Sequence, residues 1–96
     1  MVPEPAEQQR ASLEIVNRLG LHARAAALLV QTAGSFDAEV TVAKDGHVAN
    51  GRSIMGVMML AAEQGSHIEV TATGPQAGEA LEAIRALVEG RFQEEE

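Results

Sequence analysis

Residues 12–34 read SLEIVNRLGLHARAAALLVQTAG, and this stretch predicts a strand, a loop and a helix in succession. Residues 12–16 alternate polar and apolar side chains, which is the period of a half-buried strand. Residues 17–20 interrupt that alternation. Residues 23–33 are rich in Ala and Leu without a helix breaker, and Gly34 supplies a C-terminal stop. We therefore expect a strand that passes through a short loop directly into a helix.

Working outward, the following residues predict a hairpin. Residues 36–43 alternate again, with every second side chain apolar. Residues 44–47 contain Asp-Gly, which favours the positive φ angles of tight turns. A short second strand passes through Val48, and Asn50-Gly51 ends it.

The last part of the chain predicts helix, strand and helix. Ser53 can cap a short helix that runs through Leu60. Residues 67–73 alternate as a strand does. Gly74-Pro75 is expected to start the final helix, since proline is tolerated at the first helical position. The apolar residues that follow recur at i, i+3, i+4 and i+7, which gives the helix one apolar stripe.

The resulting order is β-α-β-β-α-β-α, an α+β protein. Strands with one apolar face and helices with one apolar stripe predict an open-faced two-layer sandwich, its mostly antiparallel sheet covered by all helices on one side. Residues 1–10 are expected to form a loose, flexible extension, and residues 93–96 a solvated acidic tail.

Composition restricts the function. The chain has 96 residues, enough for one small domain, and a formal net charge of −7. An acidic protein without Trp or Tyr is a poor nucleic-acid binder. There is no cysteine, the first ten residues do not form a signal peptide, and no apolar run can span a bilayer. His47 and His67 lack metal-ligand spacing, so we expect no metal site. We expect a cytoplasmic protein without direct membrane insertion.

Gly20-Leu21-His22-Ala23-Arg24 is the segment best suited to chemistry. The backbone N–H groups of Ala23 and Arg24 would be the first of the helix and have no intrahelical partner, so they and the helix dipole favour an anion at His22. Arg24 adds planar donors that suit phosphate oxygens, and Arg18 could add a second cation. The same field disfavours the imidazolium, which leaves a ring nitrogen able to accept and release a phosphoryl group.

Two interpretations of His22 remain open from these residues alone. It could simply begin the helix as a cap, or it could carry a phosphoryl group between enzymes. The neighbouring sequence offers no metal site, nucleotide cradle or catalytic triad, so the site could hold a phosphoryl group without extracting one from a nucleotide.

Two segments carry a resemblance to a known family. Residues 20–26, GLHARAA, resemble the active-site signature of the HPr family, the histidine-containing phosphocarrier proteins of the bacterial phosphotransferase system. Residues 50–58, NGRSIMGVM, resemble the regulatory-serine segment of that family at the expected distance. The resemblance covers residues 11–92 and implies a four-stranded antiparallel sheet of order 1-4-2-3 with three helices on one face.

The resemblance also implies a mechanism. His22 would be phosphorylated on Nδ1 by enzyme I, with phosphoenolpyruvate as the ultimate donor, and would pass the group to IIA-type domains. Arg24 matches the phosphate-contacting arginine of the family. The protein would be a monomeric carrier, not an enzyme with its own small-molecule substrate, and would need no cofactor.

Regulation and docking are implied in the same way. Ser53 matches the serine phosphorylated by HPr kinase/phosphorylase, although it can equally be a simple helix cap. The partner-docking residues by resemblance are Ala27, Ile54, Met55 and Met58. We expect Val57 and Leu60, on the same helix, to be core residues.

The chain departs from the sugar-transport members at three positions. Ala25 replaces the usual proline, and Gln31 and Gly34 replace lysines. The Ala-rich helix start and Gly74-Pro75 look closer to the nitrogen-type branch, NPr. Two other classes stay open: a regulatory interaction module that transfers no phosphate, and a ferredoxin-like small-molecule-binding domain in which His22 has no special role.

Overall fold

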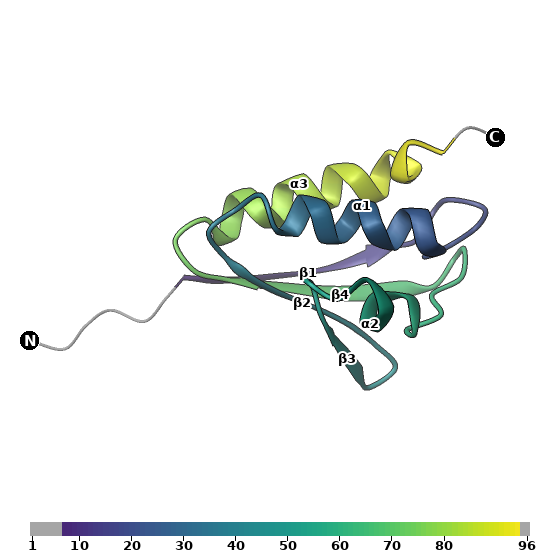
Figure 1. The fold of residues 1–96 in the computed structure, drawn as a ribbon, viewed down its shortest axis with the longest axis horizontal. Coiled ribbons are helices and arrows are strands. Elements are labelled where there is room, and N and C mark those ends of the chain that lie inside the picture. Colours follow the sequence, from purple (N-terminus) through teal and green to yellow (C-terminus); the bar gives the residue numbers. More distant parts are fainter. Residues whose placement is uncertain (1–6, 95–96) are drawn as a thin grey trace, which may run out of the picture.

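The computed structural model describes residues 7–94, which form one four-stranded sheet and three α-helices (Figure 1). In chain order the elements are β1 (Gln8–Glu14), α1 (Ala23–Ala33), β2 (Glu39–Lys44), β3 (His47–Asn50), α2 (Ile54–Met58), β4 (His67–Thr73), α3 (Ala77–Glu89) and a single 3-10 turn (Arg91–Gln93). The strand order is β1-β4-β2-β3 with every neighbouring pair antiparallel, so the predicted α+β fold and strand order are confirmed. None of the helices among these residues has the length and hydropathy to span a bilayer.

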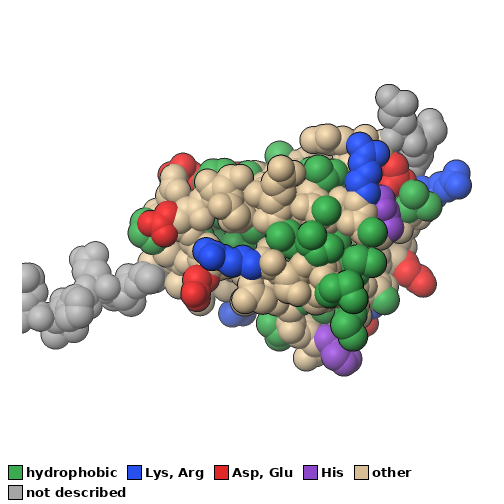
Figure 2. All heavy atoms as spheres, viewed as in Figure 1, with side chains coloured by type: hydrophobic (Ala, Val, Ile, Leu, Met, Phe, Trp, Pro, Cys, Tyr) green, Lys and Arg blue, Asp and Glu red, His purple; other side chains and the backbone are tan. Residues whose placement is uncertain are grey.

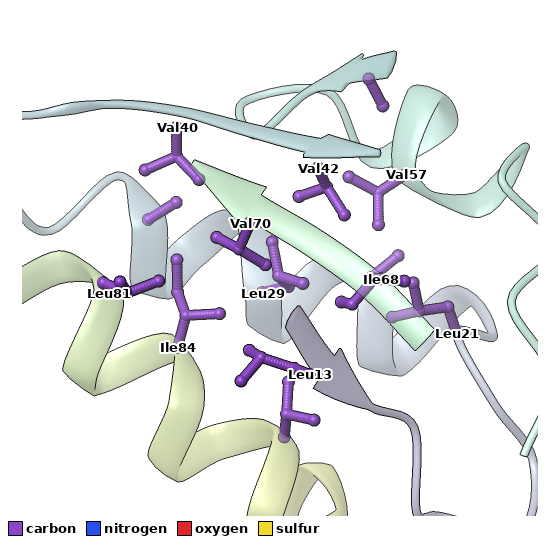
Figure 3. Packing of buried hydrophobic residues seen from close by; sticks show 14 of the residues in the cluster. Leu13, Leu21, Leu29, Val40, Val42, Val57, Ile68, Val70, Leu81 and Ile84 are labelled. Carbon is purple, nitrogen blue, oxygen red and sulfur yellow. The ribbon is translucent and has the colours of Figure 1, made fainter. Parts of the chain in front are cut away.

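The core lies between the sheet and the two long helices. Figure 1 shows α1 and α3 side by side over one face of the sheet, with the short α2 beside β3. Figure 3 shows Leu29 of α1 and Ile84 of α3 facing Ile68 and Val70 of β4, and all four side chains are buried. Burial of one such side chain is worth about 2 kcal/mol, so this layer fixes the helices on the sheet.

The first strand starts earlier than the alternation predicted. β1 begins at Gln8 rather than Ser12, and Gln8 pairs with Thr73 of β4. The expectation of a loose extension is therefore wrong for Gln8–Arg10, while residues 1–6 lie outside the described range. These polar residues are exposed because β1 is an edge strand, and the backbone of β4 orders them without burial of their side chains.

Helix α3 starts later than expected. Gly74 has a φ of 135°, outside the helical region, and Pro75 lies in the turn that follows it. The N–H of Ala77 donates to the carbonyl of Gly74 at 3.1 Å, which closes this turn before the helix begins at Ala77. The α2 helix ends at Met58, two residues before the expected Leu60.

Candidate active site

The loop before α1 packs closely against the backbone of Ala62. Gly20 has a φ of 65°, and a Cβ atom there would lie 2.3 Å from the carbonyl oxygen of Ala62. The N–H of the next residue, Leu21, donates to that same oxygen at 2.9 Å. Only glycine fits this close approach of two backbones, and the contact fixes where α1 begins.

His22 is the N-cap residue of α1. Its backbone is extended, with φ −72° and ψ 179°, and its carbonyl accepts the first helical hydrogen bond from Ala26 at 2.9 Å. The imidazole makes no capping hydrogen bond and is 29% exposed. Within the part of the chain that the structure describes, the N–H groups of Ala23 and Arg24 donate to no protein acceptor. The helix start thus has free donors beside an accessible ring, as the sequence predicted.

An open depression borders His22. It is lined by Arg18, Leu19, Leu21 and His22 from the loop and by Ala61, Ala62, Glu63 and Gln64 from the segment after α2. Arg18 and Arg24 are both exposed, and neither takes part in an ion pair among residues 7–94. Figure 2 shows histidine, basic, acidic and hydrophobic side chains together at this end of the molecule. Among the described residues, these two guanidinium groups without an ion pair lie near the start of α1, together with the carboxylates of Glu63 and Glu94.

Glu94 is the neighbour of His22 that the sequence did not reveal. Its Oε2 lies 3.4 Å from the Nε2 of His22 and accepts a hydrogen bond from the Nδ2 of Asn17 at 2.9 Å. Its Oε1 accepts from the N–H of Leu19 at 3.3 Å. The hydrogen bond from Asn17 lowers the pKa of Glu94 below its ordinary value, with smaller contributions from Leu19 and His22, so the carboxylate is charged at neutral pH.

The expectation of a solvated tail is therefore wrong for Glu94, whose side chain is only 13% exposed. Residues 95–96 lie outside the described range. Asn17 is fully buried, and its Nδ2 also donates to the carbonyl of Gly20 at 2.9 Å. An asparagine between a predicted strand and a glycine was the only signal in the sequence, and it indicated a turn.

Ser53 is a working N-cap of α2. Its Oγ accepts a hydrogen bond from the N–H of Gly56 at 2.9 Å, the geometry that satisfies one free donor of a helix start. The capping role expected from the sequence is confirmed. Phosphorylation of Ser53 stays a prediction.

The predicted docking residues divide by burial. Val57 and Leu60 are buried, as expected of core residues. Ile54 is exposed and Met55 is 66% exposed, whereas Met58 is half-buried against the core. Ala27, on α1, is also half-buried.

Two exposed hydrophobic side chains near this region were not singled out from the sequence as docking residues. Leu19 borders the depression at His22, and Met59, which follows α2, is 79% exposed. We call Leu19, Ile54, Met55 and Met59 the exposed apolar set. A docking role for these residues stays a prediction.

The chemistry open to this site is narrow. Among residues 7–94 there is no group of three or more His, Asp or Glu side chains that could hold a metal ion. Within the described range, the site offers one accessible imidazole with the Glu94 carboxylate beside it, free backbone donors and guanidinium groups without an ion pair. These groups suit nucleophilic attack on phosphorus and stabilisation of phosphoryl oxygens.

Comparisons with known proteins identify the family of this chain. Residues 9–90 match the family model described as the phosphotransferase-system HPr component phosphorylation site. The chain is 48% identical to the phosphocarrier protein HPr of Neisseria meningitidis serogroup A (strain Z2491), covering 91% of this chain and 98% of that protein. It is 44% identical to the phosphocarrier protein NPr of Escherichia coli K12, covering 90% and 97% respectively. The crystal structure of HPr from Thermoanaerobacter tengcongensis superposes with a TM-score of 0.87 at 43% identity, covering 92% of this chain and 99% of the other.

Proposed function

Because the chain belongs to the HPr family of phosphocarrier proteins, we propose that His22 is its phosphoryl-carrying residue, charged by enzyme I from phosphoenolpyruvate and discharged to IIA-type domains. The observation that carries the proposal is the uncapped, accessible imidazole of His22 beside the free N–H groups of Ala23 and Arg24. A phosphoryl group on the ring would face the positive end of the helix dipole, which stabilises its charge in both directions of transfer. The protein itself then turns over no small molecule, and we place it in the cytoplasm as a monomer.

The test is incubation with enzyme I and labelled phosphoenolpyruvate. We expect an acid-labile, base-stable label on the wild-type protein and none on His22→Ala. Undiminished labelling of the variant would contradict the assignment of His22.

Arg24 has a supporting role in this proposal. Among residues 7–94 its guanidinium takes part in no ion pair, and it follows His22 by two residues, so it can reach the phosphoryl oxygens without losing one of these partners. We expect Arg24→Ala to slow transfer about tenfold while the thermal unfolding curve stays unchanged, since a hydrogen bond to a charged group is worth about 1.5 kcal/mol. Unchanged transfer rates would show that the backbone donors suffice.

Ser53 is proposed as a regulatory phosphorylation site for an HPr kinase/phosphorylase. A phosphate at a helix N-terminus is compatible with the helix, so modification would add negative charge near the exposed apolar set and leave the fold intact. Mass spectrometry of protein isolated from cells tests for the modification. Ser53→Asp preserves a good N-cap, and we expect it to weaken enzyme I binding by a few-fold. Unaltered binding would remove the regulatory role.

The surface around the C-terminal end of α1 supports a second candidate acceptor. Gln31 and Gly34 are exposed and uncharged, where sugar-transport members carry lysines. This observation favours, as the second candidate function, transfer to a nitrogen-type acceptor that is not coupled to sugar uptake. Transfer rates from the phosphorylated protein to purified IIA domains of both types would separate the two.

A further inference from the structure

The segment that follows α2 contains a left-handed alanine. Ala61 has a φ of 52°, a conformation that most L-residues adopt at a cost. A left-handed residue after the end of a helix is usually glycine, which turns the chain without strain from a Cβ atom. Ala61 is exposed, so burial of its methyl group does not compensate for the strain. An exposed residue held in an unfavourable conformation indicates that the conformation itself has a role.

Both neighbours of Ala61 are anchored. Leu60 and Ala62 are buried in the core. The N–H of Ala61 donates to the carbonyl of Met58 at 3.0 Å, which ties the residue to the last turn of α2. The left-handed φ of Ala61 therefore sets the direction in which the backbone leaves α2.

The carbonyl of Ala62 holds the loop before His22. It accepts a hydrogen bond from the N–H of Leu21 at 2.9 Å, and Gly20 packs directly against it. Leu21 immediately precedes His22, the N-cap residue of α1. The backbone direction at Ala61 thus determines where this carbonyl points and, through Leu21, where α1 begins.

We infer that Ala61 is a positioning residue for phosphoryl transfer, whose left-handed backbone fixes the start of α1 relative to α2. The inference rests on the proposed function of His22. Ala61 acts through Ala62 and Leu21 and takes no part in the bond changes of the transfer.

The location of the exposed apolar set explains why this link would matter. Met55 lies on α2 and Met59 directly follows it, so a partner docked there meets His22 at a place that is set through Ala61. A Cβ atom restricts the φ and ψ angles of the link, whereas glycine would let it move more freely. Misplacement of reacting groups by about 1 Å slows a reaction strongly, so the restriction favours transfer.

Hydrogen exchange at the Leu21 amide tests the link without a partner protein. In the full-length protein we expect this amide to exchange about tenfold faster in Ala61→Gly than in the wild type, because its hydrogen bond to Ala62 opens more easily. Ala61→Asn should exchange as the wild type does, since asparagine keeps a Cβ atom and adopts left-handed angles more readily than alanine. Equal exchange in the wild type and Ala61→Gly would overturn the inference.

Transfer kinetics, with this protein as the substrate of enzyme I, give the second readout. We expect Ala61→Gly to lower kcat about fivefold and to leave KM unchanged, because the exposed apolar set is not altered. Ala61→Asn should keep the wild-type kcat. A wild-type kcat in Ala61→Gly would overturn the inference. A rise in KM alone would also overturn it, because the methyl group would then act as a docking contact.

Asp45→Gly is the matched control. Asp45 has a φ of 50° and lies in the turn between β2 and β3, whereas other residues line the depression at His22. This variant makes the same change from a left-handed residue to glycine away from the site, so we expect wild-type exchange at Leu21 and a wild-type kcat. Equal changes in Asp45→Gly and Ala61→Gly would overturn the inference.

Stability separates a positioning role from damage to the fold. Glycine at position 61 removes the cost of the left-handed angles and increases the entropy of the unfolded chain, and the first effect is the larger. We therefore expect the urea denaturation midpoint of Ala61→Gly to lie at or above that of the wild type, although kcat falls. A lower midpoint together with the lower kcat would indicate general destabilisation and would overturn the inference.

The two proposals fail in different ways. If the wild-type protein takes no label on His22, the proposed function fails, while exchange at Leu21 still reports on Ala61. If the wild type is labelled and Ala61→Gly matches Asp45→Gly in exchange and kcat, only the role of Ala61 fails.

Discussion

The starts of α1 and α2 share one sequence pattern and differ in what the capping side chain does. Each has a glycine two residues before the N-cap residue, Gly20 before His22 and Gly51 before Ser53, and each glycine lies tightly against another backbone. The Ser53 hydroxyl accepts a hydrogen bond from its own helix, whereas the imidazole of His22 does not.

On the proposed function, this difference separates a structural helix start from a reactive one. At α2 the side chain satisfies a free N–H group, which stabilises the helix and engages the hydroxyl. At α1 the donors of Ala23 and Arg24 stay open and the ring faces a carboxylate instead. Free donors at a helix start cost stability, and they are the feature that an incoming phosphoryl group needs.

The largest expected effect comes from the glycine before His22. Gly20→Ala would place Cβ 2.3 Å from the carbonyl oxygen of Ala62 at a left-handed φ, so we expect a loss of about 3 kcal/mol in the free energy of unfolding. Transfer by the surviving folded protein should also slow, because the clash moves the start of α1. Chemical denaturation and the enzyme I assay measure the two effects.

Gly51→Ala is the comparison variant. Its Cβ would meet the carbonyl oxygen of Val40 at 2.8 Å without a left-handed φ, so we expect it to destabilise the protein less than Gly20→Ala does. Equal losses in the two variants would show that the left-handed conformation of Gly20 adds nothing.

The caps themselves give the next effect. Ser53→Ala removes a capping hydrogen bond and should lower the free energy of unfolding by about 1 kcal/mol. His22→Ala removes none, and we expect a change within about 0.5 kcal/mol. Urea denaturation of both variants checks this order. A larger loss in His22→Ala would mean that the ring stabilises the helix start after all.

The smallest expected effect is a pH dependence of the free energy of unfolding, which arises from Glu94 beside the start of α1. The pKa of Glu94 is lowered in the folded protein, chiefly by Asn17, so the unfolded chain binds more protons over the interval between that lowered value and 4.5. The contribution of the ionised Glu94 to the free energy of unfolding is therefore complete above this interval, and it disappears as the pH falls through the interval. The stability difference between wild type and Glu94→Gln should be largest above this interval and shrink as the pH falls below 4.5. A difference that is constant with pH would rule out the ionised contact.

The sequence was sufficient where a local pattern determined the structure. Alternation predicted β1, β2 and β4, and the Asp-Gly turn predicted β3. Composition predicted α1, the Ser53 cap predicted α2, and periodicity predicted α3, while the 3-10 turn at Arg91–Gln93 was not predicted. The Gly20–Arg24 segment located the start of α1 at His22. The length of the edge strand β1 at its N-terminal end was underestimated, because Gln8–Arg10 are ordered by pairing with β4 and not by burial. The sequence analysis missed Glu94 because Glu94 and Asn17 are 77 residues apart in the sequence. Their contact also depends on the left-handed residues before Glu94, which no local sequence pattern predicts. Long-range polar contacts of this kind produce no periodic pattern in the sequence.

The central claim is that the uncapped helix start at His22, and not the capped one at Ser53, takes the phosphoryl group from enzyme I. Mass spectrometry under alkaline conditions, after incubation with enzyme I and phosphoenolpyruvate, tests this most directly. The account predicts one phosphoryl group per chain, located on the peptide that contains His22 and absent from His22→Ala but present in Ser53→Ala. A phosphoryl group that remains in His22→Ala, or one located on another residue of the wild type, would contradict it.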